Sequence, residues 1–150
     1  MKQIKGIWLP DDDTHFEEHL NKGPEFKGAG TYQYSKITQA LACVKRYEVA
    51  LDIGAHVGLW SRVLTHYFRR IYAFEPVPNH IICFLRNLRE QIKHERVILI
   101  PIAIGNEQTD IYINTVTDNS GNAHVDNSGI KVSSKRIDDL EISSDRKSVV

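Results

Sequence analysis

Short apolar runs alternate with segments of helical periodicity over the middle of the chain. The runs at residues 49–53, 71–74 and 97–102 are almost unbroken, as in strands buried within a parallel sheet. Between them, apolar residues recur every three or four positions, which indicates helices with one buried face. This β-α-β-α-β order predicts an α/β fold in which helices cover both faces of a parallel sheet.

The N-terminal segment is expected to form a cap outside this sheet, over residues 1–30. Thr14 and Glu17 have the spacing of a capping box, and Gly23 with the proline after it predicts the end of the helix that starts there. A further helix is expected at 33–46, directly before the first strand of the sheet.

Beyond residue 109 the pattern changes to apolar triplets separated by turn residues. Asn, Ser and Gly lie between the triplets, as in turns between short strands. The pattern predicts an antiparallel β-ribbon rather than another crossover unit. We therefore expect a single domain over 1–150, in which the cap is followed by a ligand-binding βαβ core at 31–109 and a ribbon region at 110–150.

Acidic residues end the first two apolar runs. Asp52 begins a small-residue turn with the pattern D-x-G-x-x-x-G, which contains Gly54 and Gly58. Glu75 ends the second run roughly 20 residues later, the distance that a crossover helix requires. Ligands of α/β sheets bind at the carboxyl ends of the strands. We therefore expect the turn to contact a nucleoside and Glu75 to accept hydrogen bonds from two ribose hydroxyls.

The turn differs from the loops that hold nucleotide phosphates. The pattern G-x-G-x-x-G would need glycine at positions 56 and 59, where this chain has His56 and Leu59. The lysine that follows a P-loop is absent as well. A nucleoside without a pyrophosphate fits better, and S-adenosylmethionine is the obvious candidate because it combines a ribose with a positively charged sulfonium.

These motifs resemble those of the FkbM family of S-adenosylmethionine-dependent methyltransferases. The similarity covers about residues 49–140 and rests on five segments. They are Leu51-Asp52-Ile53-Gly54-Ala55-His56-Val57-Gly58, Phe74-Glu75-Pro76, Val97 to Gly105, Asn119-Ser120-Gly121-Asn122 and Arg136-Ile137-Asp138-Asp139-Leu140. The first two segments indicate the methyltransferase class, and the later ones separate the family from its relatives.

The resemblance implies a Rossmann-like class I methyltransferase sheet and methyl transfer from S-adenosylmethionine to a hydroxyl of a small molecule or glycan, without a metal. It also implies cofactor contacts from both loops and from the position just after the third strand. The residues of this cofactor site would be Asp52, Gly54, Ala55, His56, Gly58, Glu75, Pro76 and Ala103. His56 is the candidate catalytic residue, which would deprotonate the acceptor.

The sequence departs from the family pattern after Leu140. Family members continue there into a strand of the type I-K-I-D-V-E-G beside the first strand, whereas this chain continues differently and ends at Val150. We therefore expect a partial, C-terminally truncated sheet whose first strand is an exposed edge. The alternative to an active enzyme is a non-catalytic cofactor-binding fragment, or one half of an assembly completed by a partner chain. An exposed edge also predicts a homo-oligomer.

Each candidate residue also has a purely structural interpretation. Gly54 and Gly58 can serve a tight turn and a close helix–strand contact, and Asp52 can cap the helix that follows. Glu75 can be a solvated acid at the end of a strand. The segment from Asn119 to Asn122 can be a hairpin turn rather than a loop over the ligand.

Near the N-terminus, two further patterns leave alternatives open. Residues 15–19 match H-x-x-E-H, a zinc-peptidase pattern, but the capping box accounts for Glu17 and no later helix offers an evident third ligand, so no metal is expected. Tyr32 and Tyr34 can cover the methionine end of the cofactor, although ordinary packing is the simpler interpretation.

Composition narrows the partners and the compartment. Of the 150 residues, 41% are apolar and 25% are charged, which predicts a folded core, and the formal net charge is zero. That balance does not favour nucleic acid or an anionic membrane as a partner. No apolar run approaches about 18 residues and the N-terminus lacks a signal-peptide pattern, so a cytoplasmic location is expected. Cys43 and Cys83 fall on apolar helix faces, where buried reduced thiols are expected.

Overall fold

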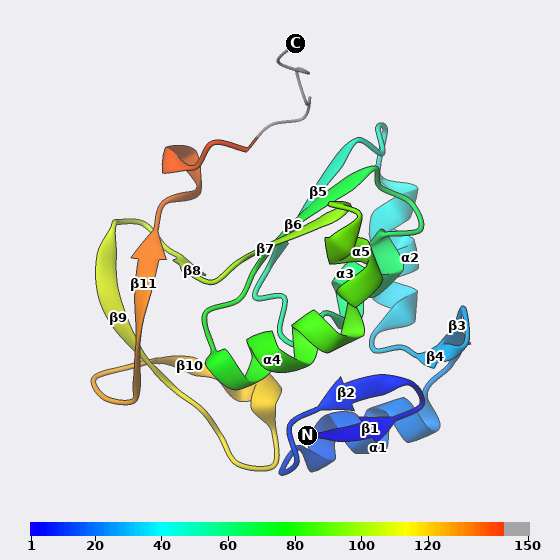
Figure 1. The fold of residues 1–150 in the computed structure, drawn as a ribbon, viewed down its shortest axis with the longest axis horizontal. Helices are drawn as coiled ribbons and strands as arrows, with labels where there is room; N and C mark the ends of the chain where they lie inside the picture. The colour runs from blue at the N-terminus through cyan, green and yellow to red at the C-terminus, as the bar shows by residue number, and fades with distance from the viewer. Residues whose placement is uncertain (143–150) are drawn as a thin grey trace.

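A parallel three-stranded sheet forms the centre of the computed structural model, which describes residues 1–142 (Figure 1). Its strands are β5 (Val49–Ile53), β6 (Arg70–Phe74) and β7 (Val97–Ile100), and their order in the sheet is β5-β6-β7. In the register of the first pair, Asp52 lies opposite Ala73. The third strand stops two residues earlier than expected because Pro101 has no backbone N–H to continue the pairing.

One face of this sheet carries the helices. They are α2 (Tyr34–Ala42), α3 (Leu59–Leu64), α4 (Pro78–Asn87) and α5 (Arg89–Lys93). Side chains from α2, α3 and α4 form one buried cluster with Ile71, Ala73 and Val97 of the strands. In the described residues, the expectation of helices on both faces is therefore wrong (Figure 1). The three strands lie side by side in the order in which they occur in the sequence. Right-handed crossovers between them therefore run in one direction and place the connecting helices α3, α4 and α5 on the same face.

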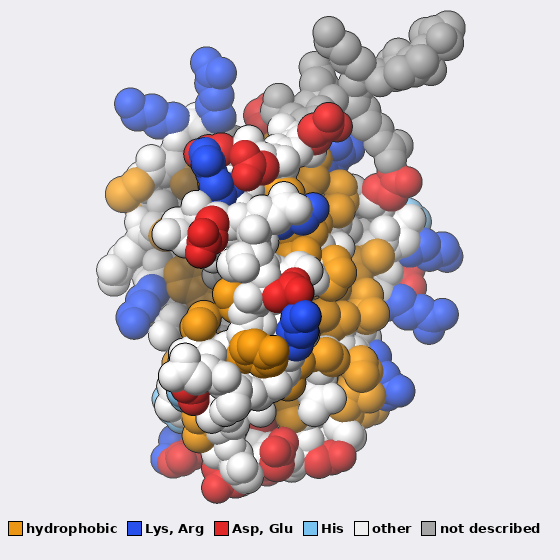
Figure 2. Space-filling view, turned by 90° about the vertical axis from the view of Figure 1, so that its left-hand side faces the viewer, with side chains coloured by type: hydrophobic (Ala, Val, Ile, Leu, Met, Phe, Trp, Pro, Cys, Tyr) orange, Lys and Arg blue, Asp and Glu red, His pale blue; other side chains and the backbone are white. Residues whose placement is uncertain are grey.

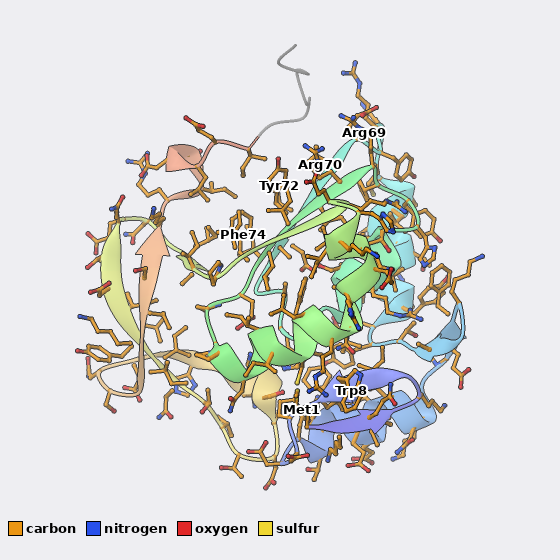
Figure 3. The ribbon with its side chains drawn as sticks, viewed as in Figure 1. Met1, Trp8, Arg69, Arg70, Tyr72 and Phe74 are labelled. Carbon is orange, nitrogen blue, oxygen red and sulfur yellow. The ribbon has the colours of Figure 1, made fainter. Side chains whose placement is uncertain are left out.

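The opposite face of the sheet bears the alternate strand residues. Tyr72 and Phe74 of the central strand point to this side, away from the helices, and both are buried (Figure 3). Leu51 and Ile53 of β5 are 42% and 54% exposed. In the described residues β5 pairs only with β6, so the first strand is an edge strand, as expected from the sequence.

A curled four-stranded sheet follows the parallel sheet along the chain. Its strands are β8 (Ala103–Ile104), β9 (Thr109–Asn114), β10 (His124–Asp126) and β11 (Ile130–Lys135), in the order β10-β9-β11-β8. The pairings of β9 with β10 and β11 are antiparallel, which confirms the expected ribbon, whereas β8 pairs in parallel with β11. Viewed from the side of the molecule on which this four-stranded sheet lies, apolar side chains form a band on the surface (Figure 2). The last part of the expected ribbon region, 143–150, lies outside the described residues.

The N-terminal cap packs beneath the helices. It contains β1 (Lys2–Ile4), β2 (Ile7–Leu9), α1 (Thr14–Lys22), β3 (Glu25–Phe26) and β4 (Ala29–Gly30). The expected capping box is wrong: the N-cap residue is Asp13, whose carboxylate accepts a hydrogen bond from the backbone N–H of Phe16, and Glu17 pairs with Lys2 instead. An acid one residue before Thr14 is an equally good cap, and Lys2 is the stronger partner for Glu17 because it is charged.

Asn87, near the end of α4, joins the cap to the centre of the molecule. Its side-chain oxygen accepts from the Trp8 N–H at 2.7 Å, and its amide nitrogen donates to the carbonyl oxygens of Trp8 and Val57. The guanidinium of Arg86 lies 4.9 Å from the centre of the Trp8 ring (Trp8 is labelled in Figure 3). These contacts hold the cap hairpin against both α4 and the turn after β5.

The remaining features are local. Two short 3₁₀ helices, η1 (Ser120–Asn122) and η2 (Ile137–Asp139), lie in the C-terminal half. Cys83 is buried as expected, but Cys43 is exposed, because α2 ends at Ala42 and Cys43 is the C-cap residue rather than part of the buried face. In residues 1–142, no helix combines the length and the apolar character needed to cross a membrane.

Candidate functional site

The carboxyl ends of β5 and β6 open onto two adjoining cavities. The larger has a volume of about 420 Å³ and lies between the turn after β5, helix α1 of the cap and the η1 turn. The smaller, of about 170 Å³, lies between the end of β6 and the ribbon sheet. Gly54, His56 and Gly121 line both cavities, so the turn after β5 separates them. The sequence expectation of a ligand at this edge of the sheet therefore corresponds to an actual hollow.

Gly54 leaves open space where the two cavities meet. Its φ of +74° lies in the left-handed region, and a Cβ atom added there would meet nothing within 4 Å. The backbone N–H groups of Gly54 and Ala55 both donate to the carbonyl oxygen of Phe74, at 2.9 and 3.0 Å. The turn is therefore tied to the end of β6, and a side chain at position 54 would project into unfilled space.

Glu75 is 4% exposed, and its carboxylate holds the same turn from the side of β6. It accepts hydrogen bonds from the backbone N–H groups of His56 at 2.8 Å and Val77 at 2.9 Å, and it lies 3.1 Å from Nδ1 of His80. Burial raises the pKa of this carboxyl, but the bonds from His80, Val77 and His56 outweigh burial and hold the pKa below its usual value. Glu75 lines the smaller cavity. Its ribose role remains a prediction, now for a carboxylate that already has three partners.

Asp52 lies at the end of β5 and lines the larger cavity. Its carboxylate accepts a hydrogen bond from the hydroxyl of Ser61 at 2.6 Å, and Ser61 lies in the first turn of α3, so Asp52 contacts the start of the following helix, as the capping alternative expected. Burial raises the pKa of Asp52, and the charge of Glu75 adds to this effect, although the Ser61 bonds oppose it. A nearby positive charge would favour the ionised carboxylate.

His56 lies in the turn with a φ of +53°, a left-handed conformation that is uncommon for residues other than glycine. Its ring packs against Phe16 at a centroid distance of 4.6 Å and against His80 at 4.4 Å. The Nε2 atom lies 2.5 Å from the hydroxyl oxygen of Ser120. Burial lowers the pKa of His56 to about 3, with the neighbouring His80 acting in the same direction and Glu75 against it. The ring is therefore neutral near pH 7 and a weak proton acceptor.

The other predicted cofactor residues divide between the cavities and the packing. Ala55 lines the larger cavity and Pro76 the smaller one. Gly58 lines neither, because its role is close packing: a Cβ atom there would lie 2.6 Å from a side-chain carbon of Leu88. Ala103 also lies away from both cavities, in strand β8 opposite Ser134 of β11. The structure therefore gathers six of the eight predicted residues around the cavities.

The cap and the η1 turn supply walls that sequence reasoning largely missed. Aromatic rings from the cap and from the helix after the turn line the larger cavity, and they belong to His15, Phe16, Tyr32 and Trp60. The η1 turn contributes Asn119 and Asn122, which fits the expectation of a loop over a ligand. Tyr32 thus lines the larger cavity, whereas Tyr34, the first residue of α2, packs against the hydrophobic core. The ring centroids of Phe16 and Tyr32 lie 4.7 Å apart, so the two rings pack against each other.

The described side chains that line the two cavities carry negative charge or none. Among the described residues that line them, none is Lys or Arg, whereas Asp52 lines one and Glu75 the other. Phosphate sites in proteins use such cations or a series of backbone N–H groups. Aromatic faces and carboxylates instead suit a ligand that carries positive charge.

The H-x-x-E-H segment has ordinary partners. The rings of His15 and His19 lie 4.3 Å apart, and Glu18 pairs with Lys22 on the surface of α1. Within residues 1–142, no group of three or more His, Cys, Asp or Glu side chains is arranged to hold a metal ion.

Fold and site together define a mixed α/β protein with a cavity at the carboxyl ends of parallel strands, the usual ligand position of this class. No protein family model and no curated protein matches the chain. Among solved structures, the methyltransferase FkbM from Methylobacillus flagellatus KT is similar over 75% of this chain, with a TM-score of 0.47 and 15% sequence identity. The chain covers 28% of that protein. The resemblance in structure to this methyltransferase is a distant one.

Proposed function

We propose that the two cavities bind S-adenosylmethionine and that the protein is a methyltransferase acting on a hydroxyl of a small molecule or glycan. One observation carries the proposal. An acidic residue stands at the carboxyl end of each of two adjacent parallel strands, Asp52 and Glu75, on either side of the open space at Gly54. The motif resemblance of the turn and of Phe74-Glu75-Pro76 supports the same ligand.

The charge of the site favours this cofactor over a nucleotide. S-adenosylmethionine carries a sulfonium and an ammonium group, and the cavity linings offer carboxylates and aromatic faces without Lys or Arg among the described residues. The partly buried Asp52, whose pKa is raised by burial, would gain a compensating positive charge from the ammonium group. A di- or triphosphate would meet unfavourable charge in the same place.

Glu75 would hold the ribose with what remains of its hydrogen-bonding capacity. A carboxylate offers about four lone-pair sites, and the N–H groups of His56, Val77 and His80 account for three of them. One ribose hydroxyl is therefore the number that fits without rearrangement of the turn. Two hydroxyls, as the sequence suggested, would require His80 or the turn to give up a bond.

Bound S-adenosylmethionine would supply an electrophilic methyl group. The role of the protein would be to hold the acceptor hydroxyl in line with that methyl group and to exclude water. In such a reaction, proximity provides much of the acceleration. Phe16, Tyr32 and Trp60 form the apolar wall suited to excluding water from the larger cavity. His56 is too weakly basic in this environment to be the obvious general base, because burial lowers its pKa to about 3.

A second candidate function is favoured by the edge strand. Leu51 and Ile53 of β5 are largely exposed, and β5 has one paired neighbour among the described strands. Unpaired strand edges associate readily with other chains. In this alternative the protein binds the cofactor without catalysing transfer by itself, and a second copy of the chain extends the sheet at β5. Light scattering separates the two: a monomer at high concentration removes the assembly.

Calorimetric titration with S-adenosylmethionine tests the proposed ligand. Gly54→Val should weaken binding at least about tenfold, or ~1.4 kcal/mol, because the side chain would fill the open space between the cavities. Gly28→Val is a matched control, since Gly28 has a φ of +77° and also meets nothing within 4 Å, but lies in the cap turn between β3 and β4.

Several results would contradict the proposal. If the wild-type protein binds ATP but not S-adenosylmethionine, the electrostatic argument is wrong. If both glycine variants bind like the wild type, the turn is structural only. Transfer of a labelled methyl group to sugars or small alcohols then distinguishes an enzyme from a cofactor-binding component.

A further inference from the structure

We propose that Asp13 and Ser120 are positioning residues that fix which nitrogen of the His56 ring carries the proton, and thereby present the Nδ1 atom of His56 to the ligand as a hydrogen-bond acceptor. Neither Asp13 nor Ser120 is among the residues predicted to contact the cofactor, although Ser120 lies in the Asn119–Asn122 segment, for which a loop over the ligand was one expectation. The proposal rests on the function proposed above for the identity of the ligand, but not for the arrangement of the three side chains.

The three side chains form a continuous hydrogen-bonded chain that starts at the cavities: His56 lines both of them, Ser120 lines the smaller one, and Asp13 is bonded to Ser120. The Ser120 hydroxyl lies between the other two: its Oγ is hydrogen-bonded to a carboxylate oxygen of Asp13 and is 2.5 Å from Nε2 of His56. Asp13 is 1% exposed and Ser120 is 7% exposed. The chain joins the start of α1, the η1 turn and the turn after β5, and each of these segments contributes residues to the lining of the larger cavity.

Chemistry sets the direction of the hydrogen bonds in this chain. A carboxylate can only accept, and Asp13 accepts from the backbone N–H of Phe16 at 2.8 Å and of Ser120 at 3.3 Å as well as from the Ser120 hydroxyl. The hydroxyl has one proton, which it gives to Asp13. Its oxygen must therefore accept a proton from His56, so Nε2 carries the hydrogen.

The consequence appears on the other side of the ring. A neutral imidazole carries one N–H, so a proton on Nε2 leaves a lone pair on Nδ1. No described residue is a partner of Nδ1, and His56 lines both cavities. Burial keeps the ring neutral by lowering the pKa of His56 to about 3. Nδ1 is thus suited to accept a hydrogen bond from a hydroxyl or amino group of a bound ligand.

The same network could be read as a simple tie between the cap and the η1 turn. Other hydrogen bonds also attach the cap to the segment before the η1 turn, however. The backbone N–H groups of Thr14 and His15 both donate to the carbonyl oxygen of Asp118, at 3.1 and 2.9 Å. A variant that alters the Asp13 side chain while keeping these bonds can therefore separate positioning of His56 from attachment of the cap.

The decisive measurement is the tautomer of His56 in the protein without ligand. Long-range ¹H–¹⁵N correlation spectra of the ¹⁵N-labelled protein distinguish Nε2–H from Nδ1–H in a neutral ring. We expect Nε2–H for His56, assigned by comparison with His56→Asn. A ring protonated on Nδ1 would overturn the proposal, because Ser120 would then be the donor to His56.

Asp13→Asn should reverse the chain of hydrogen bonds. Asn is as good an N-cap as Asp, and its oxygen must face the Phe16 N–H, so its amide N–H₂ faces Ser120. The Ser120 hydroxyl then accepts from Asn and donates to Nε2, which moves the His56 proton to Nδ1. The weak bond from the Ser120 N–H would be lost. A merely structural role of Asp13 predicts no tautomer switch, and persistence of Nε2–H would overturn the proposal.

Asp110→Asn is the matched control, because Asp110 also accepts from a serine hydroxyl, that of Ser133, but on the outer surface of the ribbon sheet. It should leave the His56 tautomer unchanged. Titration with S-adenosylhomocysteine adds the functional arm: Asp13→Asn should weaken binding at least about tenfold, and Asp110→Asn should not.

The two arms can fail separately. A switched tautomer with unchanged affinity would overturn the role of Nδ1 in ligand binding. The tautomer result decides the positioning role of Asp13 and Ser120 whether or not S-adenosylhomocysteine binds. Absence of binding to the wild-type protein would instead remove the proposed cofactor.

Discussion

The backbone N–H of His56 donates a hydrogen bond of 2.8 Å to the carboxylate of Glu75, although 19 residues separate the two in the sequence. This bond joins the turn after β5 to the end of β6. The acid expected to hold a ligand therefore also shapes the loop that would contact the ligand. Recognition by Glu75 and the conformation of the turn cannot be changed independently.

Glu75→Gln should loosen this turn. The amide oxygen can replace one carboxylate oxygen as an acceptor, but the amide N–H₂ then faces a donor, either a backbone N–H or His80. We expect a loss of about 1–3 kcal/mol in the free energy of unfolding, measured by urea denaturation. Glu90→Gln is the control, because the Glu90 side chain is 66% exposed. Equal stability of both variants would show that the buried bonds contribute nothing.

The buried neutral ring of His56 should make stability depend on pH. Its pKa is lowered from 6.5 to about 3 by burial, so below pH 6.5 the unfolded chain binds a proton that the folded protein does not. This contribution to stability is fully present above pH 6.5 and is lost as the pH falls towards 3. The slope reaches at most ~1.4 kcal/mol per pH unit for one such group.

His56→Asn isolates this contribution. Asn tolerates the left-handed conformation at this position and does not titrate. The pKa of His66 is also lowered by burial, so the wild-type slope between pH 6.5 and 5 contains both groups, and the difference from the variant measures His56. The measurement is the free energy of unfolding as a function of pH. Parallel curves for the wild type and His56→Asn would mean that His56 is protonated in the folded state.

Asp52→Asn should reduce affinity for a charged ligand more than for a neutral one. Asn keeps an oxygen that can accept from Ser61 and removes the negative charge at the larger cavity. We expect S-adenosylmethionine binding to weaken by about 1.5–3 kcal/mol, the range for a hydrogen bond to a charged group. Binding of uncharged adenosine should change little. Calorimetry with both ligands makes the comparison, and an equal loss for both would assign Asp52 a structural role.

The two thiols should differ sharply in reactivity. Cys43 is exposed, whereas Cys83 is fully buried and burial raises its pKa to about 11. A thiol reagent at pH 8 should therefore label one cysteine per native chain, and the second after denaturation. Cys43→Ser should abolish the native reaction. Rapid labelling of Cys83 in that variant would show that the packing under α4 opens readily.

Sequence patterns located the three strands of the parallel sheet well because such strands are short and almost continuously apolar, but they missed the two-residue and three-residue strands of the cap. They failed on the arrangement of helices, since the face that a helix covers depends on the direction of the crossover between strands. His80 could have been found: with Cys83 and Phe84 it lies on the buried stripe of α4, five residues after Glu75. No local pattern could join Asp13 to Ser120, because their contact exists only once the cap and the ribbon meet.

That contact spans 107 residues, and the distance has a consequence for how the protein is made. Synthesis proceeds from the N-terminus, so the cap and β5 are made before Ser120. Until then the Asp13 carboxylate remains hydrated and the cavity has no outer wall. Closing so long a loop carries an entropic penalty that local helices and hairpins avoid. We therefore expect the ligand site to be completed late in folding, after the sheet that supports it.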